Sequence, residues 1–207
     1  GLLEANLLYF IKYILRREGE SDLIMAVIFV TAIIALPFWN WTSRRFDKRR
    51  AYIAGVSFWA VVQIAIITQT ATSAFGGVLF LCVLAGIGVS AAHVLPWSIM
   101  PDAIEWGELQ SGERHEGMFY SLVTLAQKIA SSIAIPLSLL LLEATGYIPN
   151  VAEQPASAAL GIRLVVGPIP ALLLCSGILF AWFYPLGRVE YNRLNQDLKA
   201  RRSEGDG

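Results

Sequence analysis

The sequence predicts an all-α membrane protein, and three observations lead to this fold class. First, 56% of the 207 residues are hydrophobic and only 15% are charged, with a mean hydropathy of +0.56. Second, the apolar residues cluster into runs of about 19 to 29 residues, each long enough to cross a hydrocarbon core of roughly 30 Å as a helix. Third, polar joints separate these runs. Helices are favoured because a helix satisfies its own backbone hydrogen bonds inside lipid.

Six apolar segments follow one another along the chain. The first is short and opens at Gly1 in the middle of an apolar pattern, so we expect a truncated first helix. The segments are 2–15, 23–41, 51–71, 74–100, 117–142 and 164–186. The joints between them read RREGESD, SRRFDKRR, QTATS, PDAIEWGELQSGERHEG and TGYIPNVAEQPASAALG. Residues 1–186 therefore form one predicted bundle, and residues 187–207 form a polar tail.

The distribution of lysine and arginine predicts the orientation of the bundle. Five basic residues lie in the joint 42–50, five in the tail and one in the joint 101–116, whereas the opposite face has only Arg16, Arg17 and Arg163. Basic residues collect on the cytoplasmic side. We therefore expect both joints and the tail to lie in the cytoplasm. The membrane would be a plasma membrane or an inner membrane. Tryptophans near segment ends, such as Trp39 and Trp97, are expected at the headgroup level.

Lys128 stands inside the fifth apolar segment and is its only charged residue. A cation near the bilayer centre costs about 2.5–3.5 kcal/mol on insertion scales, which makes it a candidate functional residue. It lies roughly eleven residues, or about 16 Å, from the start of the segment, too far for its side chain to reach the headgroups comfortably. We expect Lys128 to face a water-lined interior.

Hydroxyl side chains share the helical face of Lys128. Residues three, four and seven positions away include Ser121, Thr124, Ser131 and Ser132, and Gln127 borders them. Together with Pro136 further along, this stripe would suit a helix that lines a cavity. Helix–helix packing, which small residues favour in membranes, explains the serines equally well.

Prolines and a histidine mark the fourth segment, GIGVSAAHVLPWSIMPD. Pro96 and Pro101 should bend or unwind the end of this helix. His93 is a candidate protonation or ligand site, and a structural, hydrogen-bonded histidine is an equal alternative.

The joint 101–116 is dense in charge and is predicted to gate the bundle at its cytoplasmic end. It follows the proline-bent helix and lies on the same face as the basic joint 42–50, so ion pairs could form in one conformation and break in another. The candidate gating residues are Asp102, Glu105, Glu108, Arg114 and Glu116, with Arg44, Arg45 and Arg49 opposite them. A solvated loop that only anchors the orientation is the simpler alternative.

Several classes of function find no support in the sequence. There is no nucleophile motif, no phosphate-binding glycine loop and too few histidines for a metal site, which argues against a membrane-embedded enzyme. No resident cofactor is expected. A nucleic-acid partner lacks a basic surface.

Residues 101–128, PDAIEWGELQSGERHEGMFYSLVTLAQK, resemble the glycoside-pentoside-hexuronide cation symporters, the melibiose permease branch of the major facilitator superfamily. The residues that carry the resemblance are Asp102, Glu105, Gly107, Glu108, Gly112, Arg114, Glu116, Gly117, Tyr120, Ser121 and Lys128, and it continues into GYIPN at 146–150. The resemblance implies that the chain is the C-terminal six-helix half, helices seven to twelve, of a twelve-helix transporter.

The resemblance also implies a mechanism, alternating access of two six-helix bundles around a central site. The lysine that matches Lys128 is needed for coupled transport in that family, and Tyr120, Ser121, Thr124, Gln127, Ser132 and His93 would line the site with it. A coupling cation, Na⁺ or H⁺, would be bound mainly by the N-terminal half, which this chain does not contain. The basic joint 42–50 looks like the gating motif between helices eight and nine.

The substrate has two candidate classes. A sugar, glycoside or related small solute is the first expectation from the family. LPWSIMPD at 95–102 looks closer to a branch that includes sodium-dependent lysophospholipid transporters, in which a lysine could meet a phosphate headgroup. A non-transporting membrane receptor or scaffold is the alternative from another class.

Overall fold

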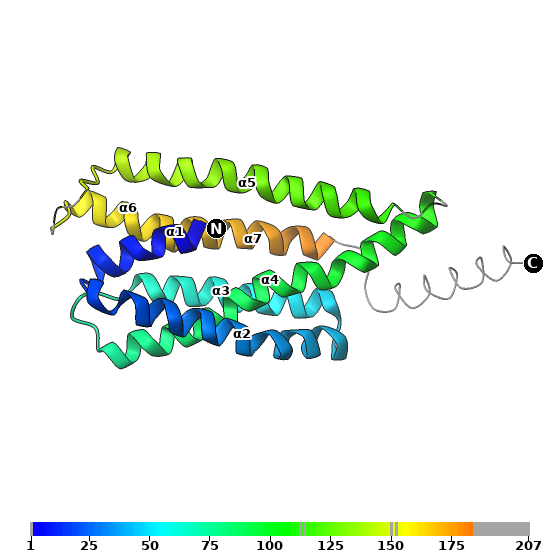
Figure 1. Ribbon diagram of the computed structural model, residues 1–207, viewed down its shortest axis with the longest axis horizontal. Coiled ribbons are helices and arrows are strands. Elements are labelled where there is room, and N and C mark those ends of the chain that lie inside the picture. The colour runs from blue at the N-terminus through cyan, green and yellow to red at the C-terminus, as the bar shows by residue number, and fades with distance from the viewer. Residues whose placement is uncertain (1, 112, 114, 150, 152, 184–207) are drawn as a thin grey trace, which may run out of the picture.

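The computed structural model describes residues 2–183 except 112, 114, 150 and 152, and the regular secondary structure in that part of the chain is all helical (Figure 1). The elements are α1 (Leu2–Tyr9), a π-helical turn η1 (Phe10–Ile14), a 3-10 turn η2 (Glu18–Glu20), α2 (Ser21–Arg45), α3 (Lys48–Ile67), α4 (Phe75–Ser111), α5 (Glu116–Ala144), α6 (Ala156–Val166) and α7 (Pro168–Phe183). The predicted tail 187–207 lies outside the described residues.

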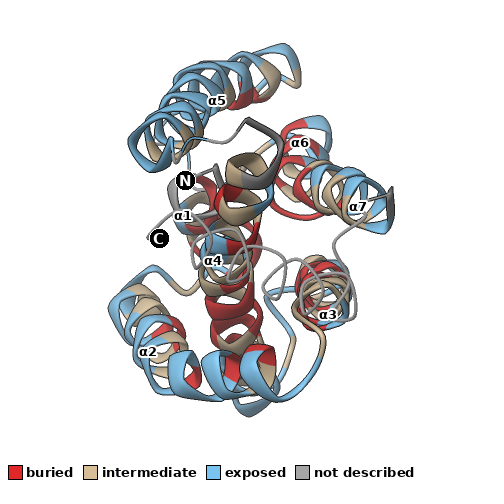
Figure 2. Cartoon of the chain, turned by 90° about the vertical axis from the view of Figure 1, so that its right-hand side faces the viewer, coloured by how far each residue is buried: buried red, intermediate tan, exposed pale blue. Residues whose placement is uncertain are grey.

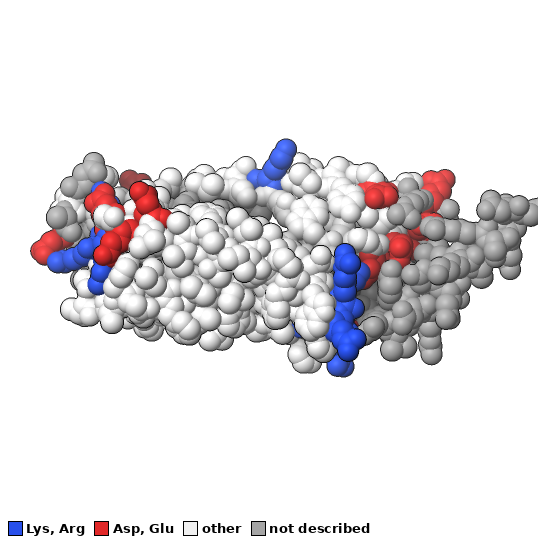
Figure 3. Space-filling model, turned by 60° about the horizontal axis from the view of Figure 1, so that its bottom comes forward, with Lys and Arg blue, Asp and Glu red and all other residues white. Residues whose placement is uncertain are grey.

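Five candidate spans confirm the prediction of an α-helical membrane protein. Judged by length and composition, the helical stretches Glu18–Arg45, Lys48–Ile67, Phe75–Glu108, Glu116–Ala144 and Ala156–Trp182 can each cross a bilayer. Figure 3 shows acidic and basic side chains gathered at the two ends of the molecule. The surface between the ends is almost free of charge, and one basic side chain stands within it in this view. This distribution suits a molecule whose waist lies in lipid.

Two helix boundaries differ from the expectation. The fourth helix does not stop near residue 100 but continues to Ser111, with Pro96 and Pro101 inside it. The charged segment 101–111 is therefore helical, so its carboxylates stand at fixed positions on a helix rather than on a loop. The last span begins at Ala156 instead of 164, because residues placed in the preceding joint belong to α6.

The last span is broken between α6 and α7 at Gly167. The next residue, Pro168, lacks a backbone N–H and disfavours the helical conformation of the residue before it. Gly167 accordingly leaves the helical region, with φ −113° and ψ −82°. The two helices nevertheless follow one another in nearly one line (Figure 1), so together they make a single crossing.

Helix α4 is the centre of the bundle. It packs along α2 and α3, and α3 in turn packs along α7. Figure 2, which looks along the helices, shows α4 in the middle with much of its surface buried. Trp39 of α2 is buried here and donates its indole N–H to the Ile87 carbonyl of α4 at 2.9 Å. This hydrogen bond and the packing of α2 on α4 place the Trp39 ring inside the contact between the two helices rather than on the outer surface of the bundle.

Gly86 allows α2 and α4 to approach closely. A Cβ atom at this position would lie 2.5 Å from the Ile28 carbonyl oxygen and 3.0 Å from the Ala32 nitrogen, both backbone atoms of α2. Small residues bring helices together in this way in membranes, where packing rather than the hydrophobic effect drives association.

Arg163 of α6 joins the last span to the end of α3. Its guanidinium donates to the carbonyls of Ile67 and Gln69, the latter at 3.1 Å. These groups are at the C-terminal end of α3, where carbonyls lack partners within the helix and the helix dipole favours a cation. Arg163, which the sequence indicated only as a marker of orientation, thus also fixes α6 to the end of α3.

Helix α5 lies at the edge of the bundle. Figure 2 shows almost all of its surface exposed. Its two buried residues are Ser138 and Leu142, both in its C-terminal part, where α5 contacts α6 and α1. Large apolar side chains such as Leu122, Ile133 and Leu140 are exposed. These side chains require lipid or further protein to cover them.

Candidate functional site

Lys128 lies near the middle of α5, and its side chain is exposed on the surface of this chain. Within the described part of the chain, it makes no hydrogen bond or ion pair. Its helical neighbours Leu125 and Ile129 are 54% and 51% exposed. The ammonium therefore stands on an open helix face between apolar side chains, and a ligand or another part of the protein must supply its counter-charge in the membrane.

The hydroxyl stripe beside Lys128 is also exposed. Ser121 donates to the Met118 carbonyl at 2.9 Å, and Thr124 donates to the Tyr120 carbonyl at 2.8 Å. Both hydroxyl hydrogens are thus used within α5, which leaves the oxygens as acceptors toward a ligand or a cation. Gln127 and Ser132 are exposed on the same helix. The structure places all of these predicted residues on one accessible helix.

Tyr120 connects α5 to α4. Its ring stacks on Trp97, with ring centroids 6.2 Å apart and an interplanar angle of 13°. Further toward the C-terminal end of α4, Gly107 lies against Phe119, whose ring would be 3.0 Å from a Cβ atom at the glycine. The N-terminal end of α5 thus meets α4 through aromatic rings.

His93 is exposed on α4, and its Nδ1 lies 2.9 Å from the Val89 carbonyl oxygen one turn earlier. A carbonyl oxygen can only accept, so Nδ1 carries the hydrogen in this contact. Nε2 is then the ring nitrogen that remains for a ligand or a proton.

Lys48 and Asp102 form an ion pair across α3 and α4. The Lys48 Nζ lies 2.7 Å from Asp102 Oδ1, and the Asp102 residue is only 7% exposed. The two residues are 54 positions apart, and α4 must remain helical past Pro101 for Asp102 to reach the start of α3. A half-buried pair of this kind is costly to break by removing one partner, since the other charge stays behind.

Carboxylates continue along α4 beyond Asp102. Glu105 and Glu108 follow at helical spacing, and both are half-buried. The Glu105 Oε2 is buried and has no hydrogen-bond partner among the described residues. Buried carboxylate oxygens in proteins are normally satisfied by a proton, a cation or a hydrogen-bond donor. Glu116 is exposed at the start of α5, and Arg114 lies outside the described residues.

The basic residues opposite divide into two groups. Arg44 and Arg45 are exposed in the last turn of α2. Arg49 instead turns toward α7 and donates to the Trp182 carbonyl. Asp47 caps α3, because its side chain accepts from the Arg49 backbone N–H at 2.9 Å. Among the predicted gating residues, Asp102 forms an ion pair with a basic residue, Lys48.

Sequence reasoning missed two residues of this site, Lys48 and Trp97. Lys48 belongs to the basic joint, but nothing in SRRFDKRR indicates which of its five basic residues pairs with Asp102. Trp97 was assigned to the membrane interface. Trp97 follows His93 by four residues, about one helical turn, and this spacing was the available signal that the two side chains share one face of α4.

We expect the Lys48–Asp102 pair to contribute measurably to stability. Asp102→Asn and Lys48→Met should each lower the free energy of unfolding of the full-length protein by about 1–3 kcal/mol, and a double-mutant cycle should show coupling of about 0.5–3 kcal/mol. Arg16 and Glu153, an ion pair whose side chains are 58% and 78% exposed, serve as the control and should show less than about 1 kcal/mol. Additive effects at Lys48 and Asp102 would contradict the pairing.

Comparison with known proteins identifies the family. The family model described as "MFS/sugar transport protein" matches residues 1–188. Among curated relatives, the chain is 34% identical to an uncharacterized symporter of Synechocystis sp., over 97% of this chain and 38% of that protein. It is 34% identical to sodium-dependent lysophosphatidylcholine symporter 1-A of Danio rerio (98% of this chain, 38% of that protein) and 33% identical to symporter 1 of Gallus gallus (96% and 38%).

The chain spans about 38% of the length of these relatives. The family match covers the motif at 101–128 together with all the described helices, and it confirms the resemblance of that motif to a family of transporters. The chain belongs to the MFS/sugar transport protein family, whose members are membrane transporters and not enzymes.

Proposed function

We propose that the full-length protein is a sodium-coupled symporter of a lysophospholipid or a similar amphiphile with a phosphate headgroup, and that Lys128 binds that headgroup. The observation that carries this proposal is the placement of Lys128. Its ammonium lies on an exposed face of α5 and has no partner among the described residues. Relatives named as lysophosphatidylcholine symporters support the lipid class over the sugar class.

The chemistry of α5 suits a lipid better than a sugar. A lysophospholipid has one phosphate and one long acyl chain. An ammonium is a suitable point charge for the phosphate, and the exposed Leu125, Ile129 and Ile133 offer an apolar track along the same helix for the chain. A sugar site needs many hydrogen-bond donors and acceptors, whereas Ser121 and Thr124 already donate within α5.

The gating part of the proposal concerns the arginine-rich end, which we place in the cytoplasm. The Lys48–Asp102 pair ties α3 to α4 there, and Glu105 and Glu108 extend the acidic surface toward α5. Rearrangement of these contacts, with Arg44, Arg45, Arg49, Arg114 and Glu116, would open and close that end during alternating access.

Uptake into proteoliposomes tests the substrate class. Full-length protein is reconstituted and given an inward sodium gradient, a proton gradient or neither, with labelled lysophosphatidylcholine or a panel of labelled sugars and glycosides. We expect lysophospholipid uptake that requires the sodium gradient. Sugar uptake without lipid uptake would overturn the lipid assignment in favour of a glycoside symporter. Absence of flux of every solute, together with tight binding of a protein partner, would overturn transport in favour of a receptor or scaffold.

A further inference from the structure

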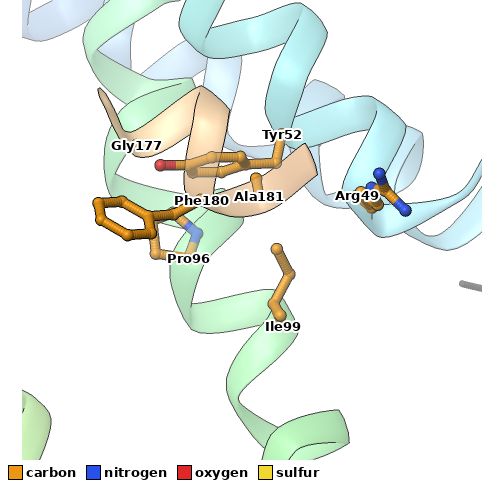
Figure 4. Close-up of a pocket in the computed structure, with 7 residues that line it drawn as sticks. All are labelled: Arg49, Tyr52, Pro96, Ile99, Gly177, Phe180 and Ala181. Atoms are coloured by element: carbon orange, nitrogen blue, oxygen red, sulfur yellow. The ribbon is translucent and has the colours of Figure 1, made fainter. Parts of the chain in front are cut away.

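A cavity of about 300 Å³ lies between α3, α4 and α7 at the arginine-rich end, on helices other than α5. Figure 4 shows Tyr52 reaching from α3 toward Gly177, with Phe180 beside Pro96 and with Ile99 further along α4. Arg49 stands at one side of the cavity. The volume is at the lower end of the range for small-ligand pockets, about 300–1,000 Å³.

The cavity is maintained by residues that cannot fill it. Gly177 has no side chain, and a Cβ atom there would lie 3.0 Å from the Tyr52 hydroxyl oxygen. That hydroxyl has no hydrogen-bond partner among the described residues. Phe180 is 79% exposed, so this wall of the cavity is also part of the surface of the bundle. An apolar chain could therefore enter from the side.

The polar groups of the cavity are positioned for an anion. Arg49 donates to the Trp182 carbonyl, which holds the guanidinium at the cavity edge with further N–H groups remaining. Residues 44–50 contain five basic residues and one acidic residue, Asp47, whose side chain caps α3. The cavity thus combines an apolar interior, one hydroxyl donor and a positively charged rim at the end of the uncharged waist.

We propose that this cavity binds an anionic glycerophospholipid from the leaflet at the arginine-rich end. The phosphate pairs with Arg49, the Tyr52 hydroxyl donates to a phosphate or ester oxygen, and an acyl chain lies against Ile99 and Phe180. Basic pockets between membrane helices attract such lipids by charge complementarity. The site is separate from α5, and the proposal does not depend on the transported substrate.

Native mass spectrometry of the full-length protein tests the site. The protein is titrated with phosphatidylglycerol or phosphatidylcholine, and bound lipid is counted. We expect preferential retention of phosphatidylglycerol, weakened about tenfold in Arg49→Gln, which retains an N–H donor for the Trp182 carbonyl. Ala181→Leu, which fills the cavity from α7, should weaken retention by a similar factor. Arg50→Gln is the matched control, since Arg50 is exposed and does not line the cavity, and should retain wild-type binding.

A second measurement is independent of retention in the spectrometer. Phosphatidylglycerol should raise the thermal unfolding temperature of the wild type and of Arg50→Gln but not of Arg49→Gln, whose own folding is checked without lipid. Equal binding by wild type, Arg49→Gln and Ala181→Leu would overturn the proposal, as would equal retention of the two lipids. Equal stabilisation by inorganic phosphate alone would show an anion site without a lipid and would also overturn it.

Discussion

Lys128→Ala is expected to lower sodium-driven uptake by the full-length protein roughly tenfold to a hundredfold while leaving its insertion and stability close to wild type. The ammonium is exposed and has no hydrogen bond or ion pair among the described residues, so its removal leaves no charged partner unpaired within them. A charged hydrogen bond to a substrate phosphate contributes about 1.5–3 kcal/mol, which corresponds to a loss of binding of roughly tenfold to a hundredfold. Initial uptake rates in proteoliposomes and thermal unfolding measure the two effects.

Two further variants separate charge from packing at this position. Lys128→Arg keeps a cation and should retain part of the uptake, whereas Ile129→Ala removes a neighbouring apolar side chain and should leave the sodium dependence intact. If Lys128→Ala transports at the wild-type rate, the lysine is not part of the mechanism. If Lys128→Ala fails to insert, its role is structural.

The largest loss of stability is expected from Gly86→Ala. The added methyl group would meet the backbone of α2, 2.5 Å from the Ile28 carbonyl oxygen, and backbone atoms cannot rotate away as a side chain can. The helices must separate, which loosens the contact of α2 with the central helix along its length. We expect a loss of about 2–4 kcal/mol in the free energy of unfolding, within the upper range for steric changes in a core. Thermal or denaturant unfolding in detergent measures it.

Gly76→Ala is the matched control because it makes the same chemical change in the same helix. A Cβ atom at Gly76 would meet nothing within 4 Å. Alanine is the better helix former by roughly 1 kcal/mol, so this variant should equal or slightly exceed the wild type in stability. Equal behaviour of the two variants would show that the close approach at Gly86 does not limit the packing of α2 on α4.

The sequence predicted the features that depend on local composition. The number and order of the apolar segments follow from the length of apolar runs relative to bilayer thickness, a property that each run has by itself. The helix ends were less accurate. Pro96 and Pro101 are strong helix breakers in water, and the sequence therefore ended the fourth helix too early. In the structure α4 continues through both, because neighbouring helices and local adjustment tolerate proline in membrane helices.

Part of the candidate site was equally accessible from the sequence. Lys128 and its hydroxyl neighbours could be placed on one helix face from spacing alone, since i, i+3 and i+4 positions always adjoin. The partners of these residues on other helices could not be predicted from spacing. Choosing Lys48 for Asp102 requires the crossing of α3 and α4, and Trp97 for Tyr120 requires the approach of α5 to α4.

By itself, the sequence determined that this chain is a helical membrane protein with a charge deep in its fifth segment, because hydropathy and helical periodicity are set by neighbouring residues. Only the tertiary structure decided which charges pair, that Trp39 is buried, and that α3, α4 and α7 leave a cavity beside Arg49. These features join residues tens of positions apart, and they depend on how closely helices can approach, as at Gly86. That distance is a property of two surfaces together and is not encoded in either segment alone.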